Sequence, residues 1–135
     1  KKVILIEDGK IASGETGRTT AHLVSALDDR YFDLESIFGE EDTKLVAESH
    51  IAAINFVEKT VREESIDCEF ERVDGYLFLH PSDKIESLRE EFEAAKRAGV
   101  RVSETSIIPG MKNYMGLSLK FPGQAQFHPV KYLQG

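Results

Sequence analysis

The sequence contains a single cysteine among its 135 residues and no long hydrophobic run. One cysteine cannot form an internal disulfide, so a reducing compartment, the cytoplasm, is the expected location. No apolar stretch approaches the roughly 20 residues that a membrane-spanning helix needs. The first residues are basic and then apolar, but the apolar run before Glu7 is too short for a signal peptide. We therefore expect neither a disulfide framework nor a membrane span.

Clusters of lysine and arginine are also missing. The formal net charge is −7, from 24 acidic and 17 basic residues, and no segment is a basic block. Nucleic-acid phosphates and anionic membrane surfaces both select for clustered positive charge. We therefore expect no nucleic acid and no membrane as a partner. Apolar residues make up 41% of the chain, which suits a soluble globular domain with one sizeable core.

The usual side-chain sets for metal binding or nucleophilic catalysis are not found. No two histidines have the spacing that chelates a metal on one helix or strand, so we predict no metal site. No Ser, His and Asp set can be assembled from spacing, and the catalytic residues stay unassigned. His50 falls on the apolar stripe of an expected helix, where a core or interface histidine is the simplest interpretation.

The first half of the sequence predicts a strand, a loop and a long helix. Residues 3–6 are apolar and largely β-branched, which favours a strand buried on both faces, as in a parallel sheet. A polar loop follows over residues 9–20. Residues 33–38 resemble a short helical turn that Gly39 closes. Residues 40–65 have helical periodicity, and their apolar stripe consists of Val46, His50, Ile54, Val57 and Val61.

The second half predicts two hairpins and two more helices. Asp74-Gly75 between apolar β-formers indicates a hairpin within residues 68–80, and Pro122-Gly123 indicates another between 117–121 and 124–127. A helix starts at 81–83 and ends at Gly99, a short strand follows at 100–102, and Glu93 and Arg97 can pair one turn apart. A last helix starts at 128–130 with proline in its first turn. The core stripe of the middle helix is Ile85, Leu88, Phe92 and Ala95.

This order of elements predicts an α+β protein. From about residue 67 onward, we expect mostly antiparallel strands with helices on one face. The strand at 3–6 fits that layer poorly, since its continuous apolar pattern is typical of parallel sheets.

The stretch IEDGKIASGETGRTTAHL, residues 6–23, has the composition of a ligand-binding edge. In a dinucleotide-binding unit the second strand ends in an acid that hydrogen-bonds a ribose hydroxyl, and Glu7 has that position. The loop at 13–20 supplies hydroxyls, an arginine and backbone amides, which suit phosphates or a polar ring system. The glycine-rich G-x-G-x-x-G turn is absent, and by spacing alone an ordinary surface loop explains the same residues.

Residues 3–7 and 11–22 resemble the second strand and flavin loop of FAD-dependent oxidoreductases of the D-amino-acid oxidase and glycine oxidase superfamily. Residues 66–76 and 121–133 are similar to one subgroup, in which a Rieske iron–sulfur domain commonly follows the flavoprotein. The resemblance implies an incomplete, Rossmann-like FAD-binding portion over residues 1–66. It also implies a substrate-domain region over 67–128, whose sheet covers one face of the flavin, and a return to the FAD domain over 129–135.

The resemblance further implies the contacts to the cofactor. Glu7 matches the acid that binds the adenosine ribose of FAD. The loop positions that match contacts to the pyrophosphate and isoalloxazine are Ser13, Gly14, Thr16, Gly17, Arg18, Thr19, Thr20 and His22. No catalytic residue is carried over, because in this superfamily the flavin performs the redox chemistry.

The expected function is that of one part of an FAD-dependent oxidoreductase. The parent enzyme would transfer a hydride to the flavin from an amino acid or a secondary amine, and a Rieske domain or another acceptor would take the electrons. The glycine turn would precede residue 1 and no Rieske CxH…CxxH pattern occurs, so we expect an internal segment that holds no FAD and is inactive by itself. Its first strand would be disordered, associate with a second copy or be covered by another chain. The alternative is a stand-alone α+β binding or interaction module without redox activity.

Overall fold

The computed structural model of this chain describes residues 2–4 and 6–135, so Lys1, and Leu5 of the expected first strand, lie outside the described residues. Helices and strands are interspersed along the described chain. In order, they are η1 (Glu15–Gly17), β1 (His22–Leu23), α1 (Tyr31–Glu63), β2 (Glu71–Phe78), α2 (Ile85–Arg97), β3 (Ser103–Thr105), β4 (Ser118–Gln126) and α3 (Pro129–Gln134).

Strand β4 is the centre of the sheet. The strand order over the described residues is β1-β4-β2, and β3 also pairs with β4. β1 pairs with one end of β4 through His22 and Gln126, whereas β3 pairs with the other end through Thr105 and Ser118. All of these pairings are antiparallel, as expected from the sequence, and no parallel pair forms among the described residues.

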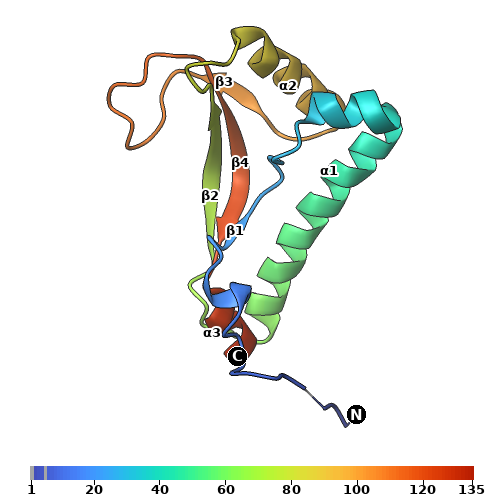
Figure 1. The fold of residues 1–135 in the computed structure, drawn as a ribbon, viewed down its shortest axis with the longest axis vertical. Coiled ribbons are helices and arrows are strands. Elements are labelled where there is room, and N and C mark those ends of the chain that lie inside the picture. The colour runs from blue at the N-terminus through green and yellow to red at the C-terminus, as the bar shows by residue number, and fades with distance from the viewer. Residues whose placement is uncertain (1, 5) are drawn as a thin grey trace.

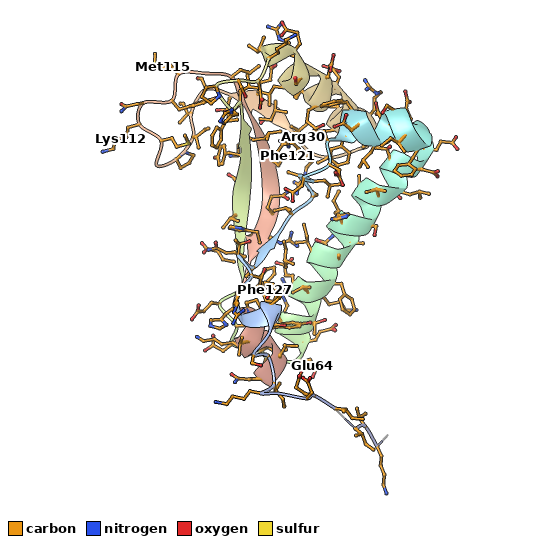
Figure 2. The ribbon with its side chains drawn as sticks, in the orientation of Figure 1. Arg30, Glu64, Lys112, Met115, Phe121 and Phe127 are labelled. Carbon is orange, nitrogen blue, oxygen red and sulfur yellow. The ribbon has the colours of Figure 1, made fainter. Side chains whose placement is uncertain are left out.

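Helices α1 and α2 lie on the same side of this sheet, while α3 lies at its far end beside η1 (Figure 1). The core forms between the sheet and the two larger helices. Phe121, labelled in Figure 2, is a fully buried side chain of β4 that belongs to this core. The other buried members of the cluster are Tyr31, Ala47, Leu88, Ala94, Ala95, Ala98, Val100 and Leu119. No helix in the described part of the chain is long and apolar enough to cross a membrane.

Helix α1 is bent at Gly39, which has a φ of +83° and a ψ of 168°, outside the helical range. The expectation that Gly39 closes a first helical segment is therefore confirmed, because this left-handed backbone favours glycine. The predicted apolar stripe is confirmed except at His50, because Ile54 is buried and Val46, Val57 and Val61 are half-buried. Thr43 and Ala47 are the other buried residues of α1 after the bend. His50 is exposed, so the prediction that it lies in the core is wrong, whereas its alternative place at an interface stays a prediction.

Neither predicted hairpin forms. Asp74-Gly75 lies inside the continuous strand β2, and Pro122-Gly123 lies inside the continuous strand β4. The two stretches face each other across the ladder, where Val73 pairs with Gln124 and the next pair is Gly75 with Phe121. The two residues 122–123 therefore oppose the single residue 74, which makes a β-bulge.

Glycine permits this bulge in both strands. Gly123 has a φ of +76°, a left-handed conformation that disfavours other residues. A Cβ atom on Gly75 would lie 3.1 Å from Cγ of Gln124, a tight contact, so glycine here lets the two strands approach without displacing that side chain. The dipeptides Asp-Gly and Pro-Gly thus mark a bulge, although their composition is typical of turns.

The remaining elements follow the sequence with small shifts. Helix α2 ends before Gly99, whose φ is +82°, as expected. The predicted strand at 100–102 is displaced to β3, because Val100 is buried in the core instead. Arg97 does not form the expected pair with Glu93 but bonds Glu35 of α1, at 2.6 Å between Nη2 and Oε2.

The described residues of the predicted first strand, 3–4 and 6, form no strand. Val3, Ile4 and Ile6 are 86%, 85% and 88% exposed, and none of the described residues before η1 pairs with a strand. Figure 1 shows this segment extending away from the sheet and helices. A two-sided apolar strand needs parallel neighbours and covering helices, and the described residues supply neither.

Candidate functional site

A cleft of about 260 Å³ lies where the polar loop meets the start of α3. The loop contributes Thr16, Gly17 and Thr19, and residues 127–130 form the opposite wall, with Glu69 at the same cleft. Figure 1 shows η1 beside α3 at this end of the molecule. Two segments from opposite ends of the chain therefore meet at one polar depression.

The loop is held by local hydrogen bonds and by one close approach. The backbone N–H of Arg18 donates to the carbonyl of Glu15 at 2.9 Å, which closes the single turn η1. A Cβ atom on Gly17 would lie 3.3 Å from the carbonyl oxygen of Ala12 and 3.9 Å from Cγ2 of Val130. Glycine at this position thus avoids a tight contact within the loop itself, and the loop lies against Val130 of α3 at ordinary contact distance.

Hydrogen-bond donors remain available at this cleft. The hydroxyl oxygen of Thr19 accepts the N–H of Ala21 at 3.1 Å, so its own hydrogen is left to donate elsewhere. Nδ1 of His128 accepts the N–H of Lys131 at 3.3 Å, which caps α3. The opposite ring nitrogen, Nε2, therefore carries the hydrogen of the neutral imidazole. Hydroxyl and imidazole donors at one depression suit an oxygen-rich ligand.

An ion pair between Glu69 and Lys131 lies beside this cleft. Nζ of Lys131 is 2.5 Å from Oε1 of Glu69. The hydrogen bond from the ammonium lowers the pKa of Glu69, and the same bond raises the pKa of Lys131. Both groups therefore stay charged near neutral pH and largely cancel each other's charge.

The other predicted site residues do not line this cleft. The carboxylate of Glu7 accepts the N–H of Gly9 at 3.2 Å and is exposed. Arg18 pairs weakly with Glu15 at 3.7 Å, and both side chains face solvent. His22 is exposed in β1, opposite Gln126. The exposed loop positions outside the cleft also include Ser13, Gly14 and Thr20.

Residues 127–130 and Glu69 are site residues that the residue pattern alone did not identify. The resemblance matched His128-Pro129 only to the return of the chain from one domain to the next. The sequence feature that points to these residues is the proline at the first position of α3. This proline fixes where the helix starts and hence where His128 lies. What the sequence could not supply is that this turn faces the loop near residue 17.

A buried carboxylate lies at a second place, the contact between α1 and α2. Glu91 of α2 accepts the backbone N–H of Phe32 at 3.4 Å, at the first turn of α1. Burial raises the pKa of Glu91 to about 7, against smaller lowering effects that include this bond. Helix α1 begins at Tyr31, and no side chain of its own N-terminus caps it. Glu91 of α2 serves as the cap instead.

A metal-binding cluster of side chains is not found within residues 2–4 and 6–135. No group of three or more His, Cys, Asp or Glu side chains in this part of the chain could hold a metal ion. The single cysteine, Cys68, is buried and unpaired with another cysteine.

Two curated relatives match almost the whole chain. The first is "Putative Rieske 2Fe-2S iron-sulfur protein YhfW" of Bacillus subtilis (strain 168), 32% identical over 98% of this chain and 26% of the relative. The second is "Probable oxidoreductase OrdL" of Haemophilus influenzae, 19% identical over 100% of this chain and 32% of the relative. The chain thus spans about a quarter to a third of the length of these relatives. No solved structure matches.

The family described as "FAD dependent oxidoreductase" matches residues 1–135, which is the whole sequence given. This match agrees with the resemblance of the polar loop and of the stretch around His128 to that superfamily. It also covers both walls of the cleft in a single alignment. The chain therefore belongs to the family of FAD-dependent oxidoreductases.

Proposed function

We propose that this chain supplies a cofactor-contacting loop and part of the substrate-side sheet of an enzyme that oxidises an amino acid or a secondary amine. The observation that carries the proposal is the cleft between the polar loop and the start of α3. It joins the segment that resembles the flavin loop to the segment that resembles the return to the FAD domain. FAD is the cofactor of the family to which the chain belongs.

The residues at the cleft fit the polar part of FAD. Thr19 keeps a hydroxyl hydrogen for donation, and Thr16 adds a second hydroxyl at the same wall. Hydroxyl donors of this kind bind phosphate oxygens. The cleft measures about 260 Å³, which is small beside the 300–1,000 Å³ of ordinary cofactor pockets. These residues would therefore hold one portion of FAD, and other parts of the enzyme would hold the rest.

Bound FAD would supply the acceptance of a hydride from the carbon next to the substrate nitrogen. The chain's own contribution is to bind and orient. Thr16 and Thr19 would position the cofactor, and the ion pair of Glu69 with Lys131 would hold the start of α3 against the sheet. The exposed face of the sheet, opposite α1 and α2, would cover the substrate side.

The electron acceptor of the reduced flavin would lie outside this chain. The relative from Bacillus subtilis carries a Rieske iron–sulfur cluster in its name. We propose that electrons leave the flavin through such a domain in the same polypeptide. This chain has one cysteine, so it cannot itself provide the two cysteines and two histidines of a Rieske centre. A CxH…CxxH pattern elsewhere in the full-length sequence would support the proposal, and its absence would contradict it.

The loop contacts can be tested by removing hydroxyls without changing side-chain shape. In the full-length protein, Thr16→Val and Thr19→Val should each weaken FAD binding by about tenfold, because each removes a donor to a charged oxygen. The measurement is a titration of the apoprotein with FAD, followed by flavin fluorescence. The matched control is Thr60→Val, since Thr60 donates to the carbonyl of Phe56 within α1. Unchanged affinity in both loop variants would refute the loop as an FAD contact.

The substrate class needs its own measurement. Anaerobic addition of amino acids and of secondary amines to the flavin-loaded, full-length protein should bleach the flavin absorbance within the turnover time. If FAD binds but neither class of amine reduces it, the cofactor assignment stands and the substrate assignment fails.

A further inference from the structure

A second cavity, of about 160 Å³, lies on the helix side of the sheet. Its walls come from α1, from the bulge of β2 and β4, and from the turn after α2. It shares no lining residue with the cleft near the polar loop. Two arginines, Arg72 and Arg101, line it, and so do the apolar side chains of Ile54 and Val100.

Arg72 is held rigidly at this cavity. Its Nη1 donates to the carbonyl of Gly123 at 2.6 Å, and its Nη2 donates to Oδ1 of Asn55 at 2.7 Å. Nη2 and Nε both bond Oε2 of Glu58, at 2.6 and 3.2 Å. These bonds lower the pKa of Glu58, so this carboxylate stays ionised and compensates the charge of Arg72.

Arg101 reaches the same place from the other side. Its Nη2 lies 3.0 Å from the position that a Cβ atom of Gly123 would occupy. The guanidinium therefore lies over the bare backbone of the bulge, in tight contact with the place that a side chain at residue 123 would take. Among the described residues, no carboxylate lies within ion-pair distance of Arg101.

The two guanidinium groups thus lie next to one residue, Gly123. Among the described residues, Glu58 is the carboxylate that pairs with Arg72, and it also contacts Arg62 at 3.6 Å, so positive charge exceeds negative charge at this cavity. Arg101 is exposed and the side chain of Arg72 is 30% exposed, so both guanidinium groups are accessible to an anion from solvent. The planar fork of an arginine matches a carboxylate or a phosphate with two parallel hydrogen bonds.

We propose that this cavity binds a small oxyanion, either a carboxylate or a phosphate, through Arg101 with Arg72 as the fixed second cation. The volume of about 160 Å³ suits an anion of a few heavy atoms, since drug-sized ligands need at least about 300 Å³. The proposal goes beyond the proposed function and does not depend on it, because none of these groups belongs to the cofactor loop.

Protection of Arg101 from chemical modification tests the site in the full-length protein. Phenylglyoxal modifies exposed arginines, and peptide mass spectrometry reports the rate at each one. Sodium phosphate, at ten times its dissociation constant, should slow modification of Arg101 by about tenfold. Arg89, on the exposed face of α2, is the internal control and should react at an unchanged rate. Sodium chloride at matched ionic strength should protect neither residue.

Sodium acetate is tested in parallel with sodium phosphate to distinguish a carboxylate site from a phosphate site. Protection by acetate alone assigns a carboxylate site, and protection by phosphate alone assigns a phosphate site. Equal protection of Arg101 and Arg89, or none of Arg101, overturns the proposal.

A pair of variants adds a second readout. The effective anion should raise the melting temperature of the wild-type protein and of Arg89→Gln in a concentration-dependent way. The same rise should be lost in Arg101→Gln, which shortens the side chain and removes the charge but stays polar. Because Arg101 makes no ion pair that the fold depends on, this variant should fold. A rise that persists in Arg101→Gln overturns the assignment to this cavity.

Discussion

The carboxylate of Glu91 lies in the interior, 1% exposed, where it accepts the N–H of Phe32 at the start of α1. Burial raises its pKa from the ordinary 4.5 to about 7, while Arg30 lowers the value slightly and Asp33 raises it. Burial raises the pKa of the Tyr31 phenol, and the nearby charge of Glu91 raises it further. A single side chain therefore couples the contact of two helices to pH.

Glu91 makes the fold less stable as the pH rises, whereas an acid in a salt bridge makes a fold more stable as the pH rises. Between pH 4.5 and about 7 the folded chain keeps a proton on Glu91 that the unfolded chain has lost. The contribution of Glu91 to stability is therefore greatest below pH 4.5 and falls as the pH rises through about 7. In Glu91→Gln the side chain is always neutral, so this fall should disappear.

Urea denaturation across this pH range measures the effect. The difference in unfolding free energy between wild type and Glu91→Gln should move by up to about 3 kcal/mol in favour of glutamine as the pH rises. Glu90→Gln, on the exposed side of α2, is the control and should keep the wild-type profile. Parallel profiles for wild type and Glu91→Gln would contradict the assignment.

At the scale of elements, Arg72 joins α1 to the strands β2 and β4. It belongs to β2, bonds Asn55 and Glu58 of α1, and donates to the carbonyl of Gly123 in β4. Its side chain is 30% exposed, so solvent screens these bonds only in part. Such a clamp fixes the angle at which the long helix crosses the sheet.

Replacing this guanidinium should loosen the helix from the sheet. Arg72→Lys keeps the charge but loses the fork that reaches three partners, so it should destabilise the fold by about 1–2 kcal/mol. Chemical denaturation gives the value. Arg62→Gln is the matched control, because Arg62 also pairs with Glu58, at 3.6 Å, yet its side chain is 79% exposed. If both variants lose the same stability, the clamp adds nothing beyond a surface ion pair.

The sequence predicts an element well where an apolar pattern repeats over many residues. It predicts poorly where the distinction between a turn and a continuous strand depends on a single dipeptide. The stripe in residues 40–65 was enough to predict the main part of α1, and Gly39 and Gly99 marked helix ends correctly. Asp74-Gly75 and Pro122-Gly123 were misread as turns. Their true role depends on facing each other across a ladder, which no local pattern contains.

At the scale of the whole molecule, stability rests on the layer between the sheet and the helices. Phe121 is fully buried there, whereas Phe56 on the outer face of α1 is 66% exposed. Phe121→Ala should therefore cost about 3–5 kcal/mol through lost burial and an unfilled cavity. Phe56→Ala should change the unfolding free energy by less than about 0.5 kcal/mol. Urea denaturation of both variants compares them, and similar losses would place the core elsewhere.

The candidate site could be predicted only in part, for a reason that also operates at this scale. The loop around Thr16 and Thr19 is recognisable by its hydroxyls and glycines. Its opposite wall, at 127–130, comes from the other end of the chain, and only the tertiary fold brings the two together. Glu7 was expected at the end of a paired strand, but no strand pairing holds it in the described structure.

The central position of β4 also governs the order in which this molecule can be assembled. β1, β2 and β3 all pair with β4, which follows them in the chain. The register joins His22 to Gln126, and Ser25 bonds Gln124 from 99 positions away. During synthesis on the ribosome, α1 and α2 can form as soon as they emerge, because their hydrogen bonds are local. The sheet cannot form until residue 126 has left the exit tunnel. Until then β1, β2 and β3 have unpaired edges, because each of them pairs with β4, the last strand to be synthesised.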